Sequence, residues 1–129
     1  MSTSRLNPYL AFNGTAQAAM DFYTDVFGGR LAVDTYDAGA DEGRVMHAVL
    51  ETDAGYTIMA GDVSTGRPYE PMAGCSVSLS GDDERLRDYW ARLSADGTVL
   101  MALEKQVWGD EFGMCVDRFG VSWMVNISS

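Results

Sequence analysis

The chain contains an internal repeat, in which one order of extended and helical segments occurs twice along the 129 residues. Each half predicts a short strand, an amphipathic helix and then three further strands. The expected strands cover 8–12, 31–36, 44–52 and 56–60 in the first half, and 75–80, 99–107, 112–116 and 121–127 in the second. The sequence therefore predicts two βαβββ modules, over about 5–62 and about 74–129, with residues 63–73 as a Pro- and Gly-containing linker.

The two predicted helices carry apolar side chains at the spacing of one buried face. The first is expected to end at Gly28 and Gly29, and the second to begin with Asp82 as its N-cap and to end before Gly97. The apolar positions are Ala16, Ala19, Met20, Tyr23, Val26 and Phe27 in the first helix, and Leu86, Tyr89, Trp90 and Leu93 in the second.

Strand alternation assigns side chains to the two faces of each sheet. Trp123, Cys75 and Met46 are expected on the face that packs against a helix. The opposite face carries polar and soft side chains, which fit a solvent-exposed face and a cavity lining equally well. The residues on this face that we expect to contact a bound small molecule are Tyr9, Met59, Ser76, Trp108, Met124 and Asn126.

The composition excludes several classes of partner. The formal net charge is −10, which argues against binding to nucleic acid or to an anionic membrane surface. No apolar run approaches the roughly 20 residues needed to cross a bilayer, and the first residues lack a signal-peptide core, so a cytoplasmic protein is expected. Cys75 and Cys115 have no flanking metal-binding or redox motif, so both are expected to be reduced core thiols.

His47 is the only histidine and therefore the first candidate for a general base. A lone histidine on a strand is more often structural. Glu51 lies four residues further along the same predicted strand, roughly 13 Å away, so these two side chains cannot form a direct dyad.

Three segments carry a family resemblance. The segment 8–29 (PYLAFNGTAQAAMDFYTDVFGG), the segment 47–50 (HAVL) and the closing segment 108–126 resemble the PhnB-like branch of the vicinal oxygen chelate superfamily. That superfamily also includes glyoxalase I, extradiol dioxygenases and bleomycin-resistance proteins. The resemblance implies a single α+β domain, 1–129, in which the two modules form a U-shaped mixed sheet around a cavity, with the helices on the outer face, and which assembles as a homodimer.

The superfamily's enzymes present His or Gln, Glu, His and Glu from the first and last strands of the modules to a divalent metal. By strand position, these places fall near Asn7 and Gly74 and on Met59 and Met124. Thioethers are poor ligands for hard or borderline divalent ions, and an amide is a weak one. A shift of the first-strand alignment by two residues substitutes Tyr9 and Ser76, which are no better. We therefore expect no metal and no other cofactor.

The leading functional hypothesis is a protein that binds a small molecule without the usual metal. A metal-dependent lyase or dioxygenase that uses His47 with Glu51 or Glu104 is an alternative, and sequestration of a cationic, bleomycin-like drug is another. Arg67 and Tyr69, in the linker, could close over a ligand.

Overall fold

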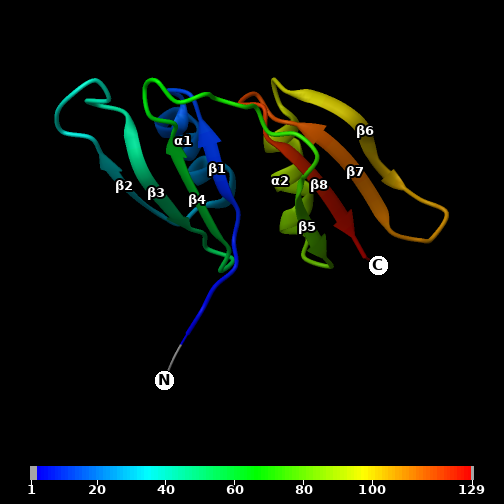
Figure 1. Cartoon of the computed structure of the whole chain (residues 1–129). Coiled ribbons are helices and arrows are strands. Elements are labelled where there is room, and N and C mark those ends of the chain that lie inside the picture. Colours follow the sequence, from blue (N-terminus) through cyan, green and yellow to red (C-terminus); the bar gives the residue numbers. More distant parts are fainter. Residues whose placement is uncertain (1–2, 129) are drawn as a thin grey trace. The chain divides into compact units, whose positions relative to one another are not determined.

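The computed structural model describes residues 3–128 and divides into two compact units, 1–71 and 72–129, at a point inside the segment 63–73. Each unit contains one helix and one four-stranded sheet (Figure 1). The first unit consists of β1 (Tyr9–Phe12), α1 (Ala16–Phe27), β2 (Arg30–Thr35), β3 (Val45–Glu51) and β4 (Thr57–Asp62). The second consists of β5 (Val77–Gly81), α2 (Arg85–Ser94), β6 (Thr98–Lys105), β7 (Glu111–Val116) and β8 (Ser122–Ile127).

The two sheets have the same topology. Their strand orders are β1-β4-β3-β2 and β5-β8-β7-β6, so the first strand of each unit lies beside the last. That pair is parallel, and the remaining pairs are antiparallel. The predicted α+β class and the repeated βαβββ order are confirmed. The U-shape and the enclosed cavity stay predictions.

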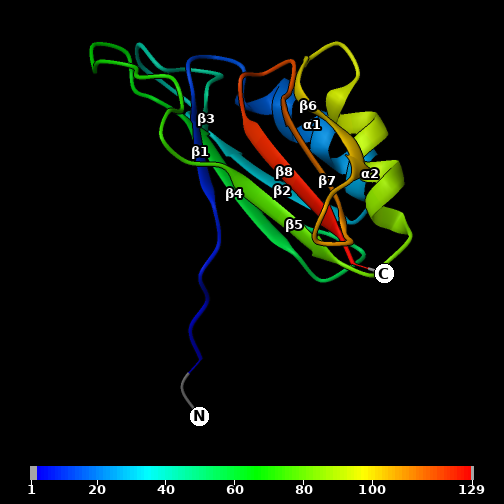
Figure 2. The same ribbon diagram turned by 90° about the vertical axis from the view of Figure 1, so that its right-hand side faces the viewer.

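The face that α1 turns to its sheet is the predicted one, and all six of its apolar positions are buried. The helix ends at Gly28, whose φ of 70° lies in the left-handed region that glycine adopts without strain. In the second unit α2 also covers one face of its sheet, as the turned view shows (Figure 2). Trp123 is fully buried there, as predicted.

The start of α2 differs from the prediction. The helix begins at Arg85, so Asp82 is not its N-cap. The N-cap is Glu84, which makes no side-chain capping bond, and the Asp83 carboxylate accepts the backbone N–H of Arg85 at 2.9 Å. Trp90, expected in the buried face, is only half-buried, and its ring lies against Gly113, where a side-chain Cβ would come within 2.8 Å of it.

Two predicted core positions are exposed. Met46 is 46% exposed, whereas Val45 is 1% exposed, because a bulge pairs Thr35 with Val45 and reverses the alternation at the start of β3. Cys75 is exposed because β5 begins only at Val77, so no neighbouring strand fixes its orientation. Cys115 is buried as predicted.

Candidate functional site

Tyr9 lies on the helix-free face of the first sheet. It pairs with Met59 of β4, which in turn pairs with Val49 of β3. The Tyr9 ring is 54% exposed, and Met59 and Val49 are half-buried. The three side chains share one row across the sheet, so they form a continuous surface accessible to a ligand.

Tyr9 and His47 form the principal contact of this face. Their rings are stacked, with centroids 5.6 Å apart and an interplanar angle of 22°, and the Tyr9 hydroxyl lies 3.3 Å from Nδ1 of His47. Gly61 makes this arrangement possible. A Cβ at residue 61 would lie 2.8 Å from the Tyr9 hydroxyl and 2.9 Å from the carbonyl oxygen of Met46. The phenol therefore occupies space that any other residue would need.

The Tyr9 hydroxyl is held in its protonated form. Burial raises the pKa of this phenol, and the neighbouring Tyr36 raises it further. A neutral phenol can donate a hydrogen bond to His47 or to a ligand. The pair can serve a ligand in two ways. If the phenol donates to Nδ1, Nε2 of His47 carries the outward donor; if Nδ1 donates to the phenol, the hydroxyl does.

On the second sheet, the corresponding face carries amide, hydroxyl and thioether groups. Ser78 pairs with Met124, which pairs with Met114. Nδ2 of Asn126 donates to the Asp110 carboxylate at 3.0 Å. The amide group of Asn126 is thereby fixed in orientation, with its Oδ1 still able to accept a hydrogen bond.

Two further predicted residues lie on or beside this face. The hydroxyls of Ser76 and Ser122 are 2.7 Å apart, so Ser76 is held by β8 although it precedes β5. Trp108 lies in the turn between β6 and β7, is 59% exposed and meets Phe112 edge to face, with the centroids 6.1 Å apart. Its contact with a ligand stays a prediction.

The register gives the strand neighbours of the positions that the resemblance assigns to metal ligands. Asn7 and Gly74 precede the strands, whereas the strand neighbours of Met59 and Met124 are Tyr9 and Ser78. A phenol, an aliphatic hydroxyl and two thioethers do not fit a divalent metal that elsewhere takes imidazole and carboxylate. Within residues 3–128, no three His, Cys, Asp or Glu side chains are close enough together to hold a metal ion.

The two glutamates that could act with His47, Glu51 and Glu104, do not lie beside it. Glu51 forms an ion pair with Arg5, in which Nη1 of Arg5 lies 3.2 Å from Oε1 of Glu51. Glu51 also borders an open hollow of about 430 Å³, which Arg30 lines as well. Glu104 lies in the other unit, on β6, and pairs with Phe112. The structure therefore does not bring Glu51 and His47 into direct contact, as the strand spacing predicts.

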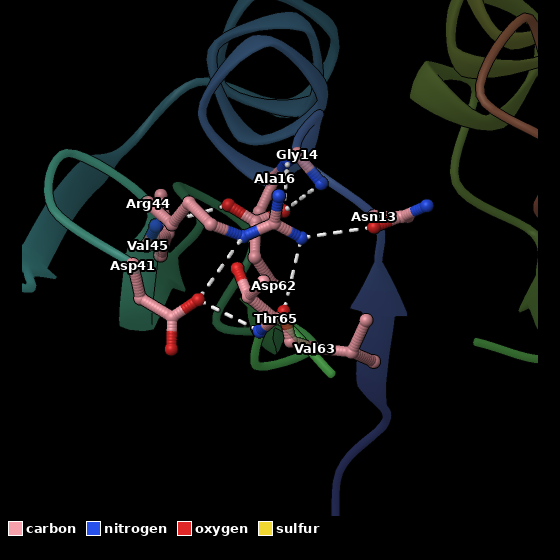
Figure 3. A network of polar contacts seen from close by, with 9 residues as sticks. All are labelled: Asn13, Gly14, Ala16, Asp41, Arg44, Val45, Asp62, Val63 and Thr65. Carbon is pink, nitrogen blue, oxygen red and sulfur yellow. Dashed lines mark hydrogen bonds and ion pairs between the residues drawn. The ribbon is translucent and has the colours of Figure 1, made fainter. Parts of the chain in front are cut away.

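A buried polar network lies next to the predicted site in the first unit (Figure 3). The Asp62 carboxylate accepts the backbone N–H groups of Gly14, Ala16 and Val45 at 2.8, 3.1 and 2.9 Å. It thereby caps α1, whose own N-cap residue Thr15 makes no side-chain bond. This network positions β3, which carries His47, against the start of the helix.

Arg44 extends the network to the segment that follows β4. Its Nη2 donates to Asn13 and to the carbonyl of Val63, both at 2.9 Å. The Asp41 carboxylate accepts the N–H of Thr65 at 2.7 Å. Hydrogen bonding with the side chain of Thr65, and then with its backbone, lowers the pKa of Asp41. The segment expected as a flexible linker is therefore attached to the first unit as far as Thr65. Arg67 follows in a turn closed by its N–H to Ser64.

Sequence reasoning missed Gly61, Tyr36 and the row of methionines that includes Met114. The period of two places Gly61 on the same face as Met59, but it does not show that Tyr9 fills the space over this glycine. Met114 was recoverable, because it lies next to the buried Cys115 and therefore on the opposite face of β7. Tyr36 was not, because it lies beyond the last residue of β2, next to the point where the bulge in β3 shifts the register.

The chain matches known proteins over almost its whole length. A family model described as the Glyoxalase/Bleomycin resistance protein/Dioxygenase superfamily matches residues 5–125. An uncharacterized protein of Mycobacterium tuberculosis is 32% identical over 92% of this chain and 71% of its own length. Protein YjdN of Escherichia coli is 26% identical over 95% of this chain and 94% of its own.

Solved structures agree with these matches. Protein PA1353 from Pseudomonas aeruginosa aligns with a TM-score of 0.86 and 35% identity, covering 98% of both chains. A Bacillus cereus protein, described as a putative 3-demethylubiquinone-9 3-methyltransferase, PhnB protein, aligns with a TM-score of 0.76 and 27% identity, covering 97% of this chain and 100% of its own. Neither described helix of the present chain has the length and apolar character of a membrane span.

Proposed function

Because the chain belongs to the glyoxalase/bleomycin resistance protein/dioxygenase superfamily, with solved relatives that include a PhnB-like protein, we propose that it binds a small molecule on the helix-free faces of its sheets, without the divalent metal of the superfamily's enzymes. The observation that carries this proposal is the pairing of the first and last strand in each unit. It places Tyr9 beside Met59 and Ser78 beside Met124, and none of these side chains suits a divalent metal.

The first face supports recognition of a ring. Tyr9 and His47 present stacked planes whose geometry is fixed by Gly61, and Met59 beside them offers a soft thioether contact. An exposed aromatic surface that is already rigid loses little side-chain entropy when a ligand stacks on it. The hydrogen-bonding ends of the Tyr9–His47 pair then select a ligand that offers a complementary acceptor or donor.

The second face supports recognition of polar groups beside an apolar floor. Asn126 is oriented by Asp110, and Ser76 is oriented by Ser122, while Met124 between them contributes apolar surface. A few fixed polar groups on a mainly apolar surface are typical of small-molecule sites.

Metal independence is tested by elemental analysis. Protein purified without chelator, and again after incubation with Ni²⁺, Zn²⁺ or Mn²⁺ and gel filtration, is expected to contain no stoichiometric metal. The double variant Met59→Glu/Met124→Glu, which restores carboxylates at the two last-strand positions, is the control for detection. One tightly held Ni, Zn or Mn per wild-type chain would overturn the proposal.

Small-molecule binding is tested with a deproteinised bacterial cell extract as the probe. Native mass spectrometry is expected to show a bound mass on the wild type that is lost in Tyr9→Ala if the ligand lies on the first face, or in Asn126→Ala if it lies on the second. Gln17→Ala is the matched control, because Gln17 is exposed on α1 and bonds only to Asp21 within its helix. A bound mass that is equal in all four proteins would place the ligand elsewhere and contradict the proposal.

We also propose that the protein is a homodimer that covers the outer strand β6. This strand lies at the edge of its sheet and exposes three successive apolar side chains, Val99, Leu100 and Met101. An apolar edge strand left open is a site of chain association, and a second copy of the same strand is a symmetric way to cover it.

A further inference from the structure

Three methionines lie in a row across the helix-free face of the second sheet. Met101 of β6 pairs with Met114 of β7, and Met114 pairs with Met124 of β8. Residues directly opposite on neighbouring antiparallel strands have Cβ atoms about 4.5–5.5 Å apart and point to the same face. From these positions we propose that Met101, Met114 and Met124 form a binding site for a soft monovalent cation, Cu(I).

The row is accessible and adjustable. In the single chain Met101 is exposed, on the strand that the proposed dimer covers, whereas Met114 and Met124 are half-buried on the inner strands. Methionine side chains are unbranched and have three rotatable bonds, so sulfurs that start from three neighbouring strands can converge on one ion above the central residue. A neighbouring sulfur is already fixed at this face, because Met72 accepts the N–H of Ser122 at 3.4 Å, two residues before Met124.

The donor chemistry selects the ion. Neutral thioethers are soft ligands that favour Cu(I) over Zn²⁺, Mn²⁺ or Mg²⁺. A site made of uncharged donors leaves the ion its positive charge, which the net charge of −10 attracts at long range. Thioethers also need no deprotonation, so binding is expected to be independent of pH, unlike binding to a thiol or an imidazole.

The fold does not require methionines at positions 101, 114 and 124. In the first sheet the corresponding positions, in register with Met59, are Val49 and Ala32. The same scaffold therefore accepts aliphatic side chains there, and a partly exposed row gives no packing reason for three flexible thioethers.

The two cysteines must be separated from the thioethers in any test. Cys75 is exposed and its thiol could capture Cu(I), whereas Cys115 is fully buried, which raises the pKa of its thiol to about 11. The experiment therefore uses the full chain carrying Cys75→Ser, with no change at Cys115.

The experiment is an anaerobic competition of metal-free protein with bicinchoninate for Cu(I), at two pH values, together with NMR of methionine [¹³C]methyl groups in the presence of Ag(I), a redox-inert substitute. We expect one Cu(I) per chain with the same affinity at both pH values, and Ag(I) shifts of the methyl signals of Met101, Met114 and Met124. The signals of Met20, in the core of the first unit, and of the isolated, exposed Met46 are expected to stay unchanged.

Substitution separates the row from other sulfurs. Met114→Leu, which keeps the volume, is expected to weaken Cu(I) binding at least about tenfold. Met46→Leu is the matched exposed control and should leave it unchanged. Failure of the Cys75→Ser protein to bind Cu(I), equal affinity in Met114→Leu, or shifts confined to Met46 would each overturn the proposal. If Met114→Leu misfolds, the Cu(I) affinity of Met124→Leu and the Ag(I) shifts of the methyl groups in the protein with all its methionines test the same proposal. None of these outcomes bears on the small-molecule site at Tyr9.

Discussion

The two units use different polar groups at matching places in the same fold. Thr52 and Asp117 both stand in the turn before the last strand, and each accepts the N–H of the residue four positions on, at 2.9 and 3.0 Å. Asp117 also accepts from the Phe119 backbone and from Nε1 of Trp123. At the end of the last strand it is the first unit that has the polar anchor. Asp62 stands there, and Ile127 stands at the matching place in the second unit. The repeat therefore conserves the apolar pattern, while the buried anchors belong to each unit alone.

The helix-free faces differ in the same way. Register places Tyr9, Met59, Val49 and Ala32 across the first sheet where the second has Ser78, Met124, Met114 and Met101. One face therefore offers aromatic and imidazole groups, and the other offers thioethers and hydroxyls. The repeated scaffold therefore carries a different set of side chains on each of its two helix-free faces.

The largest expected effect is that of removing the anchor of the first unit. Asp62→Ala leaves three backbone N–H groups without their acceptor and removes a negative charge from the N-terminus of α1. At about 1–3 kcal/mol for each unpaired buried group, partly relieved by water, we expect a loss of about 3–5 kcal/mol in the free energy of unfolding. Urea denaturation followed by circular dichroism measures it.

Asp21→Ala is the control for this change, because Asp21 is an exposed residue of α1 that only accepts from Gln17. We expect it to alter stability by less than about 0.5 kcal/mol. An Asp62→Ala protein as stable as Asp21→Ala would show that the network of Figure 3 does not hold the first unit together.

The second prediction compares the matching turns. Asp117→Ala removes three hydrogen bonds, and we expect it to cost about 2–4 kcal/mol, whereas Thr52→Ala removes one side-chain bond and should cost about 1 kcal/mol. Circular dichroism in urea titrations measures both costs, and tryptophan fluorescence adds a probe of the second unit, because Trp90, Trp108 and Trp123 all lie in it. Equal costs for the two substitutions would contradict the inferred difference between the turns.

The apolar pattern predicted most of the fold, because the spacing of apolar residues shows which face of each helix and strand is buried. The stripe from Ala16 to Phe27 and the buried Trp123 follow from periodicity alone. Errors arose where hydrogen bonding decides the geometry. The bulge that exposes Met46 and the start of α2 at Arg85, after Glu84 and not after Asp82, depend on local backbone conformation, which residue types do not specify.

The candidate site was less predictable than the fold. Tyr9 and Met59 were placed on one face by alternation, and they are paired neighbours in the structure. The stacking of Tyr9 on His47 depends on Gly61, whose role is to leave space, and a missing side chain has no signature in the periodic pattern. Ser78, rather than Ser76, is the neighbour of Met124, because the two units do not have the same offset at their first and last strands.

The third prediction concerns the outer strands β2 and β6. Leu100→Lys places a charge on the apolar edge of β6, whereas Ala32→Lys places one on the equally exposed edge strand β2. If β6 is the dimer contact, Leu100→Lys should weaken association at least about tenfold, through burial of an unpaired charge, and Ala32→Lys should not. Sedimentation at micromolar concentration measures both. A wild-type monomer, or equal effects of the two lysines, would contradict the proposed interface.

The last and smallest effect is a change in the pKa of Tyr9, which tests the surroundings of the hydroxyl on the first face. Burial is the larger cause of the raised pKa and Tyr36 the smaller, so Tyr36→Phe should lower the pKa of Tyr9 without returning it to the ordinary phenol value of about 10. NMR of ring-labelled tyrosine against pH measures the shift, with Tyr69→Phe as the control. Since the folded pKa lies above the unfolded one, the folded state retains the proton longer, and the associated stability is complete below the unfolded pKa and declines as pH rises through the folded one. A Tyr9 pKa at or below the ordinary value would show that the hydroxyl does not lie over Gly61, and the Tyr9–His47 surface would lose the rigidity on which the proposed recognition of a ring by the first unit depends.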